Sequence, residues 1–469
     1  MHDIHNVCHA YIMKLPFLNR QKEINEVNKA IKGTGPSFIV IYGRRRCGKS
    51  TLLQNISRKQ DIYYLADQRE APLQRHALAN EIERTIPGFA AVQYPSWDIF
   101  LASLNDRIKP NSCLILDEFP YMVQRSPEMP SIIQNFLDSP VKKNINLIIC
   151  GSSQRMMRGA VLDITAPLYG RAHIILKIEP LSPGWITNAF PITAFESVKA
   201  YAIFGGVPRY WELARNYKTV DAAVKQLIFD KNGILHEEPM RLLLDDMRSA
   251  AQPYSILSLI GHGCHRLSEI AGRLGKPANS LTRPLTTLID LGYVRRELPF
   301  GESVKSTRRT LYKINDPFLS FYFRFVLPNK SLLEMGLTEK VYNSIKQNLT
   351  QYISTIWEDL SRHSVPYTNI SNIKWGPAYR WWGNGKDNKP IELDIVAESM
   401  DRKHLLIGEA KWKDKTDIKR LTSGLESTAG NLPFVKGKKV IFAYWLRQYS
   451  GKKASANIIT ASDVLNCLK

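Results

Sequence analysis

The sequence has few of the features that mark membrane-embedded or disulfide-stabilised proteins. No apolar run in its 469 residues reaches the roughly 18 residues that a transmembrane helix needs. Its 6 cysteines are scattered and form no C-x-x-C pair, so we expect neither a zinc site nor a disulfide framework, and a cytoplasmic location fits. Acidic residues are also scarce, at 43 against 64 basic ones. The resulting net charge of +21 favours polyanionic partners, namely nucleotides, nucleic acid or an acidic membrane surface.

The length and the distribution of charge indicate several domains with different partners. A chain of 469 residues with 44% hydrophobic residues has enough material for two to four globular cores. Residues from 251 onward carry +14 of the net charge of +21. If nucleic acid is bound, this C-terminal half is therefore the better candidate, although a solvated basic surface explains the charge equally well.

The most specific motif is a phosphate-binding loop. An apolar run at 37–42 predicts a buried strand, and the sequence then matches G-x-x-x-x-G-K-[ST] before an apolar helical segment. In such a loop, Lys49 reaches the β- and γ-phosphates and the Ser50 hydroxyl binds Mg²⁺. ATP and Mg²⁺ are therefore the predicted cofactors. The predicted nucleotide-binding residues are Gly43, Arg44, Arg45, Arg46, Cys47, Gly48, Lys49, Ser50 and Thr51.

Two further apolar runs end in polar side chains that suit nucleotide hydrolysis. The run at 113–116 ends in Asp117 and Glu118, which predicts a carboxylate for Mg²⁺ and a second one that polarises the attacking water. The run at 146–150 is followed by Ser152 and Ser153. A hydroxyl there is placed to sense the γ-phosphate or to orient the water, but either serine equally suits a helix N-cap.

Arg171 is a candidate for stabilising the charge of the transition state. It precedes an apolar run at 172–178. An arginine near the γ-phosphate acts either within its own subunit or from a neighbouring one, and the second alternative implies a homo-oligomer. A structural ion pair explains the residue equally well.

The order of these motifs resembles the archaeal-type ATPase family, a branch of the AAA+/STAND-related P-loop NTPases. The resemblance covers most of 13–245, and the triple arginine of the loop is its most specific mark, although Cys47 stands where a small aliphatic residue is usual. It implies that Arg20 lies in the segment that frames the nucleotide base, and that the C-terminal domain has a restriction-endonuclease-like fold. The motifs are Phe17–Glu23, Tyr42–Ser50, Leu116–Pro120, Gly151–Ser153, Leu168–Arg171 and Glu179–Ser182.

The middle of the chain predicts a winged helix-turn-helix. Helical patterns at 252–260, 266–275 and 280–292 are followed by two short strands around a polar loop at 300–307. The third helix would lie in a DNA major groove, and wing arginines would contact phosphates. In STAND-like ATPases, however, such a domain often packs on the ATPase core. The helix offers Ser280, Thr282 and Arg283, and the wing offers Arg295, Arg296, Arg308 and Arg309.

The C-terminal part carries a second group of carboxylates. Asp394 lies within an alternating run at 390–397, and Glu409-x-Lys411 follows on the next apolar run, which matches the PD-(D/E)xK nuclease pattern. Asp394 and Glu409 would bind a divalent metal, Lys411 would position water, and Glu358 would be an additional helix acid. A salt-bridged surface strand pair is the alternative. Basic and aromatic residues nearby, among them Trp375, Trp381 and Trp412, suit backbone tracking and base stacking.

Two hypotheses follow from these patterns. The chain is either an ATPase coupled to DNA binding or processing, or a STAND-like switch whose C-terminal domain binds DNA or a partner without cleaving it. With both C-terminal domains suited to nucleic acid, a membrane surface loses its support. The predicted fold class is α/β, with a P-loop NTPase core built on a parallel sheet (13–180), a helical lid (181–245), a winged helix-turn-helix (246–330) and an α/β restriction-endonuclease-like domain (331–469).

Overall fold

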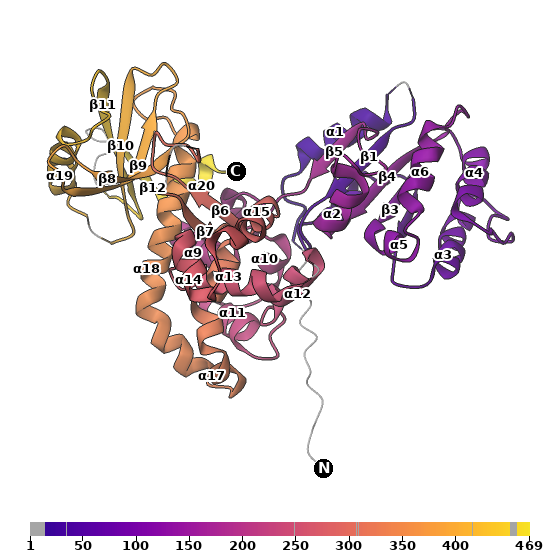
Figure 1. The fold of residues 1–469 in the computed structure, drawn as a ribbon, viewed down its shortest axis with the longest axis horizontal. Coiled ribbons are helices and arrows are strands. Elements are labelled where there is room, and N and C mark those ends of the chain that lie inside the picture. The colour runs from indigo at the N-terminus through magenta and orange to yellow at the C-terminus, as the bar shows by residue number, and fades with distance from the viewer. Residues whose placement is uncertain are drawn as a thin grey trace, which may run out of the picture. The chain divides into compact units, whose positions relative to one another are not determined.

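A computed structural model describes residues 15–469 except 34, 248, 306, 308, 415 and 451–456. The chain divides into two compact units (Figure 1). One contains Phe17–Pro180 and Leu242–Arg248, and the other contains Leu181–Arg241 and Ser249–Lys469. The short segment that follows Arg241 thus packs with the first unit, although the sequence pattern groups it with the lid and the winged helix.

The first unit is built on a five-stranded parallel sheet in the order β2-β3-β4-β1-β5. All residues of β3 and β4 are buried, which explains their continuous apolar runs, since helices cover parallel sheets on both faces. The strands are β1 (Phe38–Tyr42), β2 (Ile62–Leu65), β3 (Ser112–Asp117), β4 (Ile145–Gly151) and β5 (Ile174–Lys177).

Helices of this unit pack on the sheet and form its main core, in which Trp97, Phe100 and Phe119 are fully buried. A π-helical segment at Arg158–Leu162 follows the last of them. The helices are α1 (Gln21–Ile31), α2 (Lys49–Ile56), α3 (Ala71–Glu83), α4 (Trp97–Arg107), α5 (Phe119–Arg125), α6 (Met129–Asp138) and α7 (Gln154–Met157).

The second unit begins with a helical segment. Thr193 and Thr219 accept hydrogen bonds from the backbone N–H groups of Glu196 and Ala222, so side-chain oxygens cap two of the helices. The helices are α8 (Ile186–Ala189), α9 (Ala194–Phe204), α10 (Pro208–Ala214), α11 (Val220–Val224) and α12 (Glu238–Asp246), and the last of them runs on into the segment that packs with the first unit.

A helix-turn-helix with a wing follows, as the sequence predicts. Leu281, Leu285 and Leu288 are buried in the core of this domain, so the intervening positions of the third helix face outward. Gly275 ends the second helix in the left-handed conformation at φ 61°. The elements are α13 (Ala251–Gly261), α14 (Leu267–Leu274), α15 (Thr282–Asp290), β6 (Val294–Glu297) and β7 (Leu311–Ile314).

The C-terminal domain is a five-stranded mixed sheet in the order β12-β11-β10-β9-β8. Strands β8, β9 and β10 form an antiparallel meander, and β11 and β12 are parallel to β10. Figure 1 shows α18 running from α17 toward this sheet, where it packs on β9 and β10. The elements are α16 (Pro317–Phe321), α17 (Lys330–Glu334), α18 (Thr338–Ser364), β8 (Tyr379–Asn384), β9 (Pro390–Glu398), β10 (His404–Lys411), α19 (Ile418–Gly430), β11 (Lys439–Leu446), β12 (Asn457–Thr460) and α20 (Ala461–Cys467).

The wing packs on the C-terminal domain, so the prediction that its arginines contact DNA phosphates is wrong for Arg295, and it stays a prediction for Arg309, which is exposed. Arg295 forms an ion pair with Asp359 of α18. Burial alone would raise the pKa of the Asp359 carboxyl, but Arg295 and Arg362 hold it far below its usual range. Arg309 donates to the Trp382 carbonyl at 2.7 Å and pairs with Glu302. Arg296 stays exposed, and Arg308 lies outside the described residues.

Within the described residues, no helix combines the length and the apolar character needed to cross a lipid bilayer.

Candidate functional site

The phosphate-binding loop joins β1 to α2 and depends on two glycines with positive φ. Gly43 has φ 147°, and a Cβ atom there would lie 2.4 Å from the Ile178 carbonyl oxygen. Gly48 has φ 91° and is the N-cap of α2. This backbone directs the N-terminus of α2 toward the loop, and helix N-termini favour phosphate groups. The loop therefore has the backbone shape and the positive electrostatic potential that suit the phosphates of a nucleoside triphosphate.

Lys49 and Arg20 are fixed against the backbone of this loop. Lys49 is 4% exposed, and its ammonium group donates to the Arg44 carbonyl at 3.1 Å. Arg20 adopts φ 74° and donates to the carbonyls of Cys47, at 3.4 Å, and Glu179. Its other guanidinium nitrogen pairs with Glu23 at 3.0 Å. Arg20 thus links the start of α1, the loop and the segment after β5.

Asp117 is fully buried at the end of β3, and both of its carboxylate oxygens accept hydrogen bonds. Tyr63 of β2 donates from its hydroxyl at 2.7 Å, and the Glu118 N–H donates at 2.9 Å. Ser50 contacts the same phenol. Burial and the Asp117 charge raise the pKa of Tyr63. The structure therefore brings Ser50 and Asp117 together, and it adds Tyr63.

Glu118 and Ser152 meet beside this carboxylate, although they follow different strands. The Ser152 hydroxyl donates to Glu118 Oε1 at 2.6 Å, and the Ser152 N–H donates to Oε2 at 3.3 Å. Glu118 is held at φ 52°, a conformation that non-glycine residues adopt only where the surroundings fix it. Ser153, by contrast, is the N-cap of α7. The two serines, which the sequence leaves equivalent, thus have different contacts.

Buried Cys150 shows that these side chains share one neighbourhood. It lies on β4, burial raises the pKa of its thiol well above the usual range, and the charges of Asp117, Lys49 and Glu118 all act on it. The segment Leu242–Arg248, which packs with this unit, also borders the site. Ser153 donates to the Asp245 carbonyl at 2.9 Å, and Arg45 of the loop pairs with the Asp245 carboxylate at 3.2 Å.

Arg171 lies near the N-terminal ends of the parallel strands, whereas the phosphate-binding loop lies at their C-terminal ends. It precedes β5, whose first residue pairs with Ile39 at the start of β1, whereas the loop follows the end of β1. Its guanidinium pairs with Asp138 at 2.7 Å. This geometry contradicts the alternative in which Arg171 reaches a phosphate of its own subunit. The ion pair with Asp138 agrees with the alternative of a structural role, and action on a neighbouring subunit stays a prediction.

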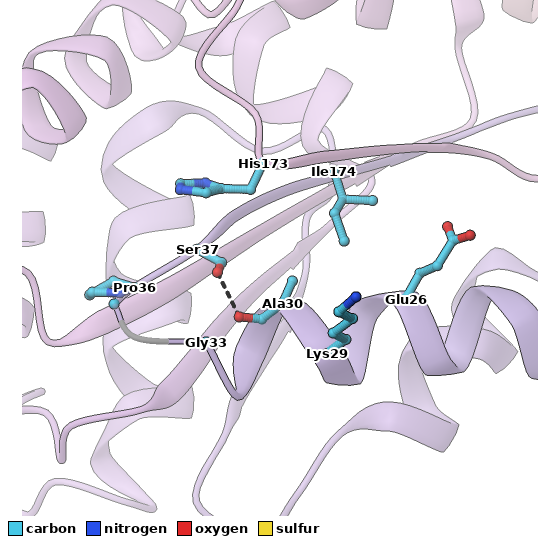
Figure 2. Close-up of a pocket in the computed structure, with 9 residues that line it drawn as sticks. Glu26, Lys29, Ala30, Gly33, Pro36, Ser37, His173 and Ile174 are labelled. Carbon is cyan, nitrogen blue, oxygen red and sulfur yellow. Dashed lines mark hydrogen bonds between the residues drawn. The ribbon is translucent and has the colours of Figure 1, made fainter.

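A hollow of about 640 Å³ lies at the N-terminal ends of β1 and β5, beside α1 (Figure 2). The Phe38 N–H donates to His173 Nδ1 at 3.0 Å, and Ser37 donates to the Ala30 carbonyl at 2.8 Å. Because the loop lies beyond the other end of β1, this hollow is separate from the nucleotide site.

The Gly43→Ala variant is expected to lose nucleotide affinity by roughly 10- to 100-fold, because the added Cβ must displace either the loop or the Ile178 carbonyl, at a cost of about 1–3 kcal/mol. Equilibrium binding of a fluorescent ATP analogue measures the loss. Gly159→Ala, where a Cβ meets no atom within 4 Å, is the matched control. Equal affinity of the two variants would contradict the close approach at Gly43.

The carboxylates of the C-terminal domain form a second cluster. Gly408 of β10 pairs with Ile395 of β9 in the antiparallel register. The next residues along the two strands, Glu409 and Asp394, therefore lie beside each other. The Ala410 N–H donates to Asp394 Oδ2 at 3.1 Å, and Lys411 pairs with Glu409. Glu358 of α18 is near enough for the Asp394 charge to act on it. The structure thus brings all four predicted residues together.

Burial and repulsion between carboxylates both act on the ionisation of this cluster. Burial and the Asp394 charge raise the pKa of Glu358 to about 7, and the same two causes raise the pKa of Glu409. Burial would lower the pKa of Lys411, but the Glu409 carboxylate outweighs it and raises that pKa. Partly buried oxygen ligands of this kind suit a divalent cation, whose charge would favour the ionised carboxylates.

The Glu358→Gln variant is expected to stabilise the metal-free protein at pH 8 but not at pH 4. The folded-state pKa of about 7 lies above the unfolded value of 4.5, so the ionised carboxyl opposes folding. Below pH 4.5 the group is protonated in both states and has no such effect, and the effect is complete above pH 7. Thermal unfolding in chelator checks this as a gain of a few degrees at high pH. A gain that does not change with pH would contradict it.

The prediction that the nearby tryptophans stack on bases is wrong for three of them. Trp375, Trp381 and Trp412 are 3%, 4% and 5% exposed and belong to the core. Trp412 packs on Trp357 of α18 and on Phe195 of α9. A strand buries alternate residues on the core side, and the sequence does not say on which side the tryptophans of β8 lie.

Two residues that the sequence reading missed hold the predicted ones in place. They are Tyr63, which binds Asp117, and Arg362, which donates to the Asp394 carbonyl at 2.7 Å and pairs with Asp359. The order of strands brings Tyr63 beside β3, and a single sequence does not reveal that order. Arg362 lies four residues after Glu358, one helical turn along α18, which is a weak signal for a shared face.

The fold, the loop and the buried carboxylates define a P-loop ATPase with a helix-turn-helix domain. Residues 17–213 match an ATPase domain found predominantly in archaea, and residues 255–298 match the IclR helix-turn-helix domain. Residues 322–421 match archaeal and bacterial proteins of unknown function. An uncharacterized protein of Methanocaldococcus jannaschii is 32% identical over 409 residues, which cover 86% of this chain and 88% of that protein. The chain therefore belongs to the same archaeal-type ATPase family.

Two solved structures are among those similar to parts of this chain. A Walker-type ATPase of Pyrococcus abyssi is 21% identical, with a TM-score of 0.47 over 65% of this chain and 95% of that one. The ORC2 protein of Aeropyrum pernix, solved with ADPNP and ADP, is 16% identical, with a TM-score of 0.42 over 69% of this chain and 97% of that one.

Proposed function

We propose that this protein is a Mg²⁺-dependent ATPase whose nucleotide cycle is coupled to DNA binding. The observation that carries the proposal is the pairing of Glu118 with Ser152 beside buried Asp117, since it gathers side chains from two strand ends at the phosphate-binding loop. The DNA part rests on the helix-turn-helix domain.

Each residue of the site has a role that its position supports. Lys49 would hold the β- and γ-phosphates, and Ser50 and Asp117 would hold Mg²⁺, which neutralises phosphate charge. Glu118 would orient the attacking water and accept its proton. Ser152 would position Glu118. Arg171, near the N-terminal ends of the strands, would act on the nucleotide of a neighbouring subunit in a homo-oligomer.

The third helix of the helix-turn-helix supports DNA binding. Ser280, Thr282 and Arg283 are exposed, as is Lys276 in the preceding turn, because the leucines of the helix face the core. Exposed basic and hydroxyl side chains at the start of such a helix suit phosphate and base contacts in a major groove.

Replacing Lys276 and Arg283 by alanine is expected to weaken duplex binding by about 10-fold and to lower the salt dependence of binding by one to two counterions. Fluorescence anisotropy over a series of salt concentrations measures both. Arg84→Ala, at an exposed arginine that is the C-cap of α3 and pairs with Glu81, is the control. If the double variant and the control bind DNA equally, the helix-turn-helix does not contact DNA.

We assign a metal-dependent nuclease activity to the C-terminal cluster. The geometry supports this assignment, because Asp394 and Glu409 lie on neighbouring strands and Lys411 pairs with Glu409. Asp394 and Glu409 would hold the metal, Lys411 would position the attacking water, and Glu358 would complete the ligand set.

A nucleotide-controlled switch is the second candidate function, and one contact favours it. Ser152 donates to both carboxylate oxygens of Glu118, and these hydrogen bonds occupy lone pairs that the attacking water would otherwise use. Hydrolysis would then be slow until that contact changes.

Turnover and nucleotide retention distinguish the two functions. The ATPase proposal predicts many turnovers per protein molecule in Mg²⁺ and rapid release of ADP. A single turnover followed by ADP that stays bound through gel filtration would favour the switch.

A further inference from the structure

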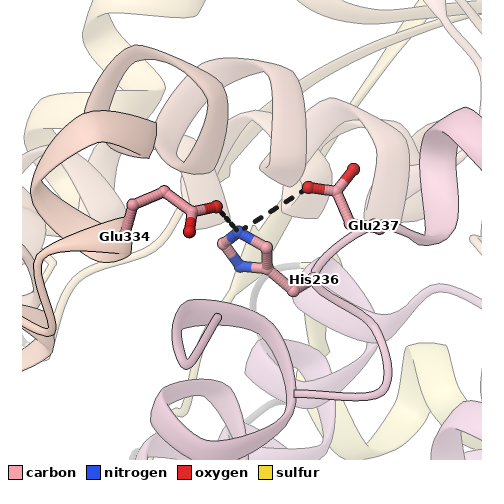
Figure 3. Close-up of side chains that lie close together, drawn as sticks. All are labelled: His236, Glu237 and Glu334. Carbon is pink, nitrogen blue, oxygen red and sulfur yellow. Dashed lines mark ion pairs between the residues drawn. The ribbon is translucent and has the colours of Figure 1, made fainter. Parts of the chain in front are cut away.

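A buried histidine faces two carboxylates in the helical part of the second unit. His236 lies in the turn before α12 and is 1% exposed, and Glu334 ends α17. Figure 3 shows the His236 ring between Glu334 and Glu237. Its Nε2 atom lies 3.4 Å from Glu334 Oε1 and 4.0 Å from Glu237 Oε1. Neither the nucleotide site nor the nuclease-like cluster uses these residues.

The hydrogen bond of the other ring nitrogen, Nδ1, shows which nitrogen of His236 carries a hydrogen. Nδ1 lies 2.9 Å from the Ile228 carbonyl oxygen, which can only accept, so Nδ1 carries the hydrogen. Nε2 is buried and has no hydrogen-bond partner among the described residues. A neutral imidazole that donates its other N–H to a backbone carbonyl is the form in which histidine binds metals.

The spacing of the three side chains suits a tetrahedral metal. Nitrogen and oxygen ligands about 2.1 Å from Zn²⁺ lie about 3.4 Å apart at tetrahedral angles. The His236–Glu334 distance matches this value, and the three ligand atoms lie within 4.8 Å of one another. Glu237 is partly exposed, so a small rotation of its side chain brings it into range.

Two lysines border the cluster but do not replace a metal at Nε2. Lys330 donates at 2.6 Å to Glu237 Oε1, the oxygen that lies 4.0 Å from His236 Nε2, so a metal would use the remaining lone pair of this oxygen. Lys231 donates to the backbone carbonyl of Glu334 at 3.3 Å. Neither lysine donates a hydrogen bond to His236 Nε2 or to the Glu334 carboxylate. The lone pairs of these two groups therefore face each other and need a cation or a proton between them.

We propose that His236, Glu237 and Glu334 bind a transition-metal ion of the Zn²⁺ class, with water as the fourth ligand. One imidazole and two carboxylates suit Zn²⁺ better than Mg²⁺, which keeps its waters and prefers oxygen ligands alone. The ion ties the turn before α12 to the end of α17. Because α12 runs from one unit into the segment that packs with the other, the ion stabilises the start of a connection between them.

Metal titration of the full-length protein tests this site. The protein is stripped with chelator and titrated with Zn²⁺ while excess Mg²⁺ occupies oxygen-ligand sites. We expect Glu334→Gln to bind one Zn²⁺ fewer than the unaltered protein, or to bind it at least 10-fold more weakly. Glu334 is about half exposed, so this change is not expected to unfold the chain. Glu339→Gln, an exposed glutamate on α18, is the control.

A second readout keeps the test independent of folding defects. Co²⁺ in place of Zn²⁺ should give a visible absorption band in the unaltered protein and in Glu339→Gln, and the band should be lost in His236→Gln and Glu334→Gln. If the unaltered protein binds no Zn²⁺, or if Glu334→Gln binds Zn²⁺ with unchanged stoichiometry and affinity, the proposal is wrong. The contact of His236 with Glu334 is then one between protein side chains alone.

Discussion

The Glu118→Gln variant is expected to hydrolyse ATP at least about 100-fold more slowly than the unaltered protein while binding ATP with similar affinity. General bases contribute about 10²–10⁴-fold to rate, and an amide cannot accept the proton of the attacking water. The amide keeps the size of the carboxylate. Its oxygen can accept from the Ser152 N–H and its NH2 group can donate to the Ser152 hydroxyl oxygen, so the strand ends stay together. Phosphate release and nucleotide binding, measured on the same sample, separate the two effects.

The control is Glu128→Gln, an exposed glutamate before α6. We expect it to hydrolyse ATP at the normal rate. If Glu118→Gln retains full turnover, Glu118 does not activate water and the observed pairing with Ser152 is structural. If it loses ATP binding as well, the pairing maintains the loop itself.

The Lys411→Ala variant is expected to lose metal-dependent DNA cleavage by at least about 100-fold. Its ammonium group lies beside Glu409 and close enough for Asp394 and Glu358 to act on it, so in the proposed nuclease it would stabilise the charge that develops on the phosphate. Cleavage of plasmid and linear duplex in Mg²⁺ or Mn²⁺, with and without ATP, measures the loss.

Lys413→Ala is the matched control, since Lys413 follows on the same segment but is exposed. We expect it to cleave normally. Cleavage that survives in Lys411→Ala would show that this cluster is not the source of the activity. No cleavage by the unaltered protein under any of these conditions would leave the domain with a binding role only.

The features of the fold that the sequence predicts are those set by residues close together along the chain. The loop between β1 and α2 depends on glycines and a lysine at fixed spacing, so a single stretch reveals it. The helices and hairpin of the winged domain follow from leucine spacing and glycine stops in the same way. Asp394 and Glu409 are also predictable, because alternation along two strands puts both acids on one face.

Features that depend on how distant segments meet were not predictable. Arg171 precedes an apolar strand, but only the register of β5 on β1 shows that it lies far from the loop. Arg295 looks like a DNA contact until the wing is seen to pack against Asp359. His236 and Glu334 belong to separate helical segments, and no sequence spacing links them. Each of these depends on tertiary packing, on which a single sequence gives little information.

Phosphate release by the unaltered protein, in Mg²⁺ and with or without duplex DNA, tests the central claim most directly. The proposed ATPase coupled to DNA predicts repeated turnover that stops in chelator and rises several-fold when DNA is added. The increase should be absent in the Lys276→Ala/Arg283→Ala variant. ATP that binds but is not turned over, with a rate that DNA does not change, would contradict this account and favour a nucleotide-controlled switch.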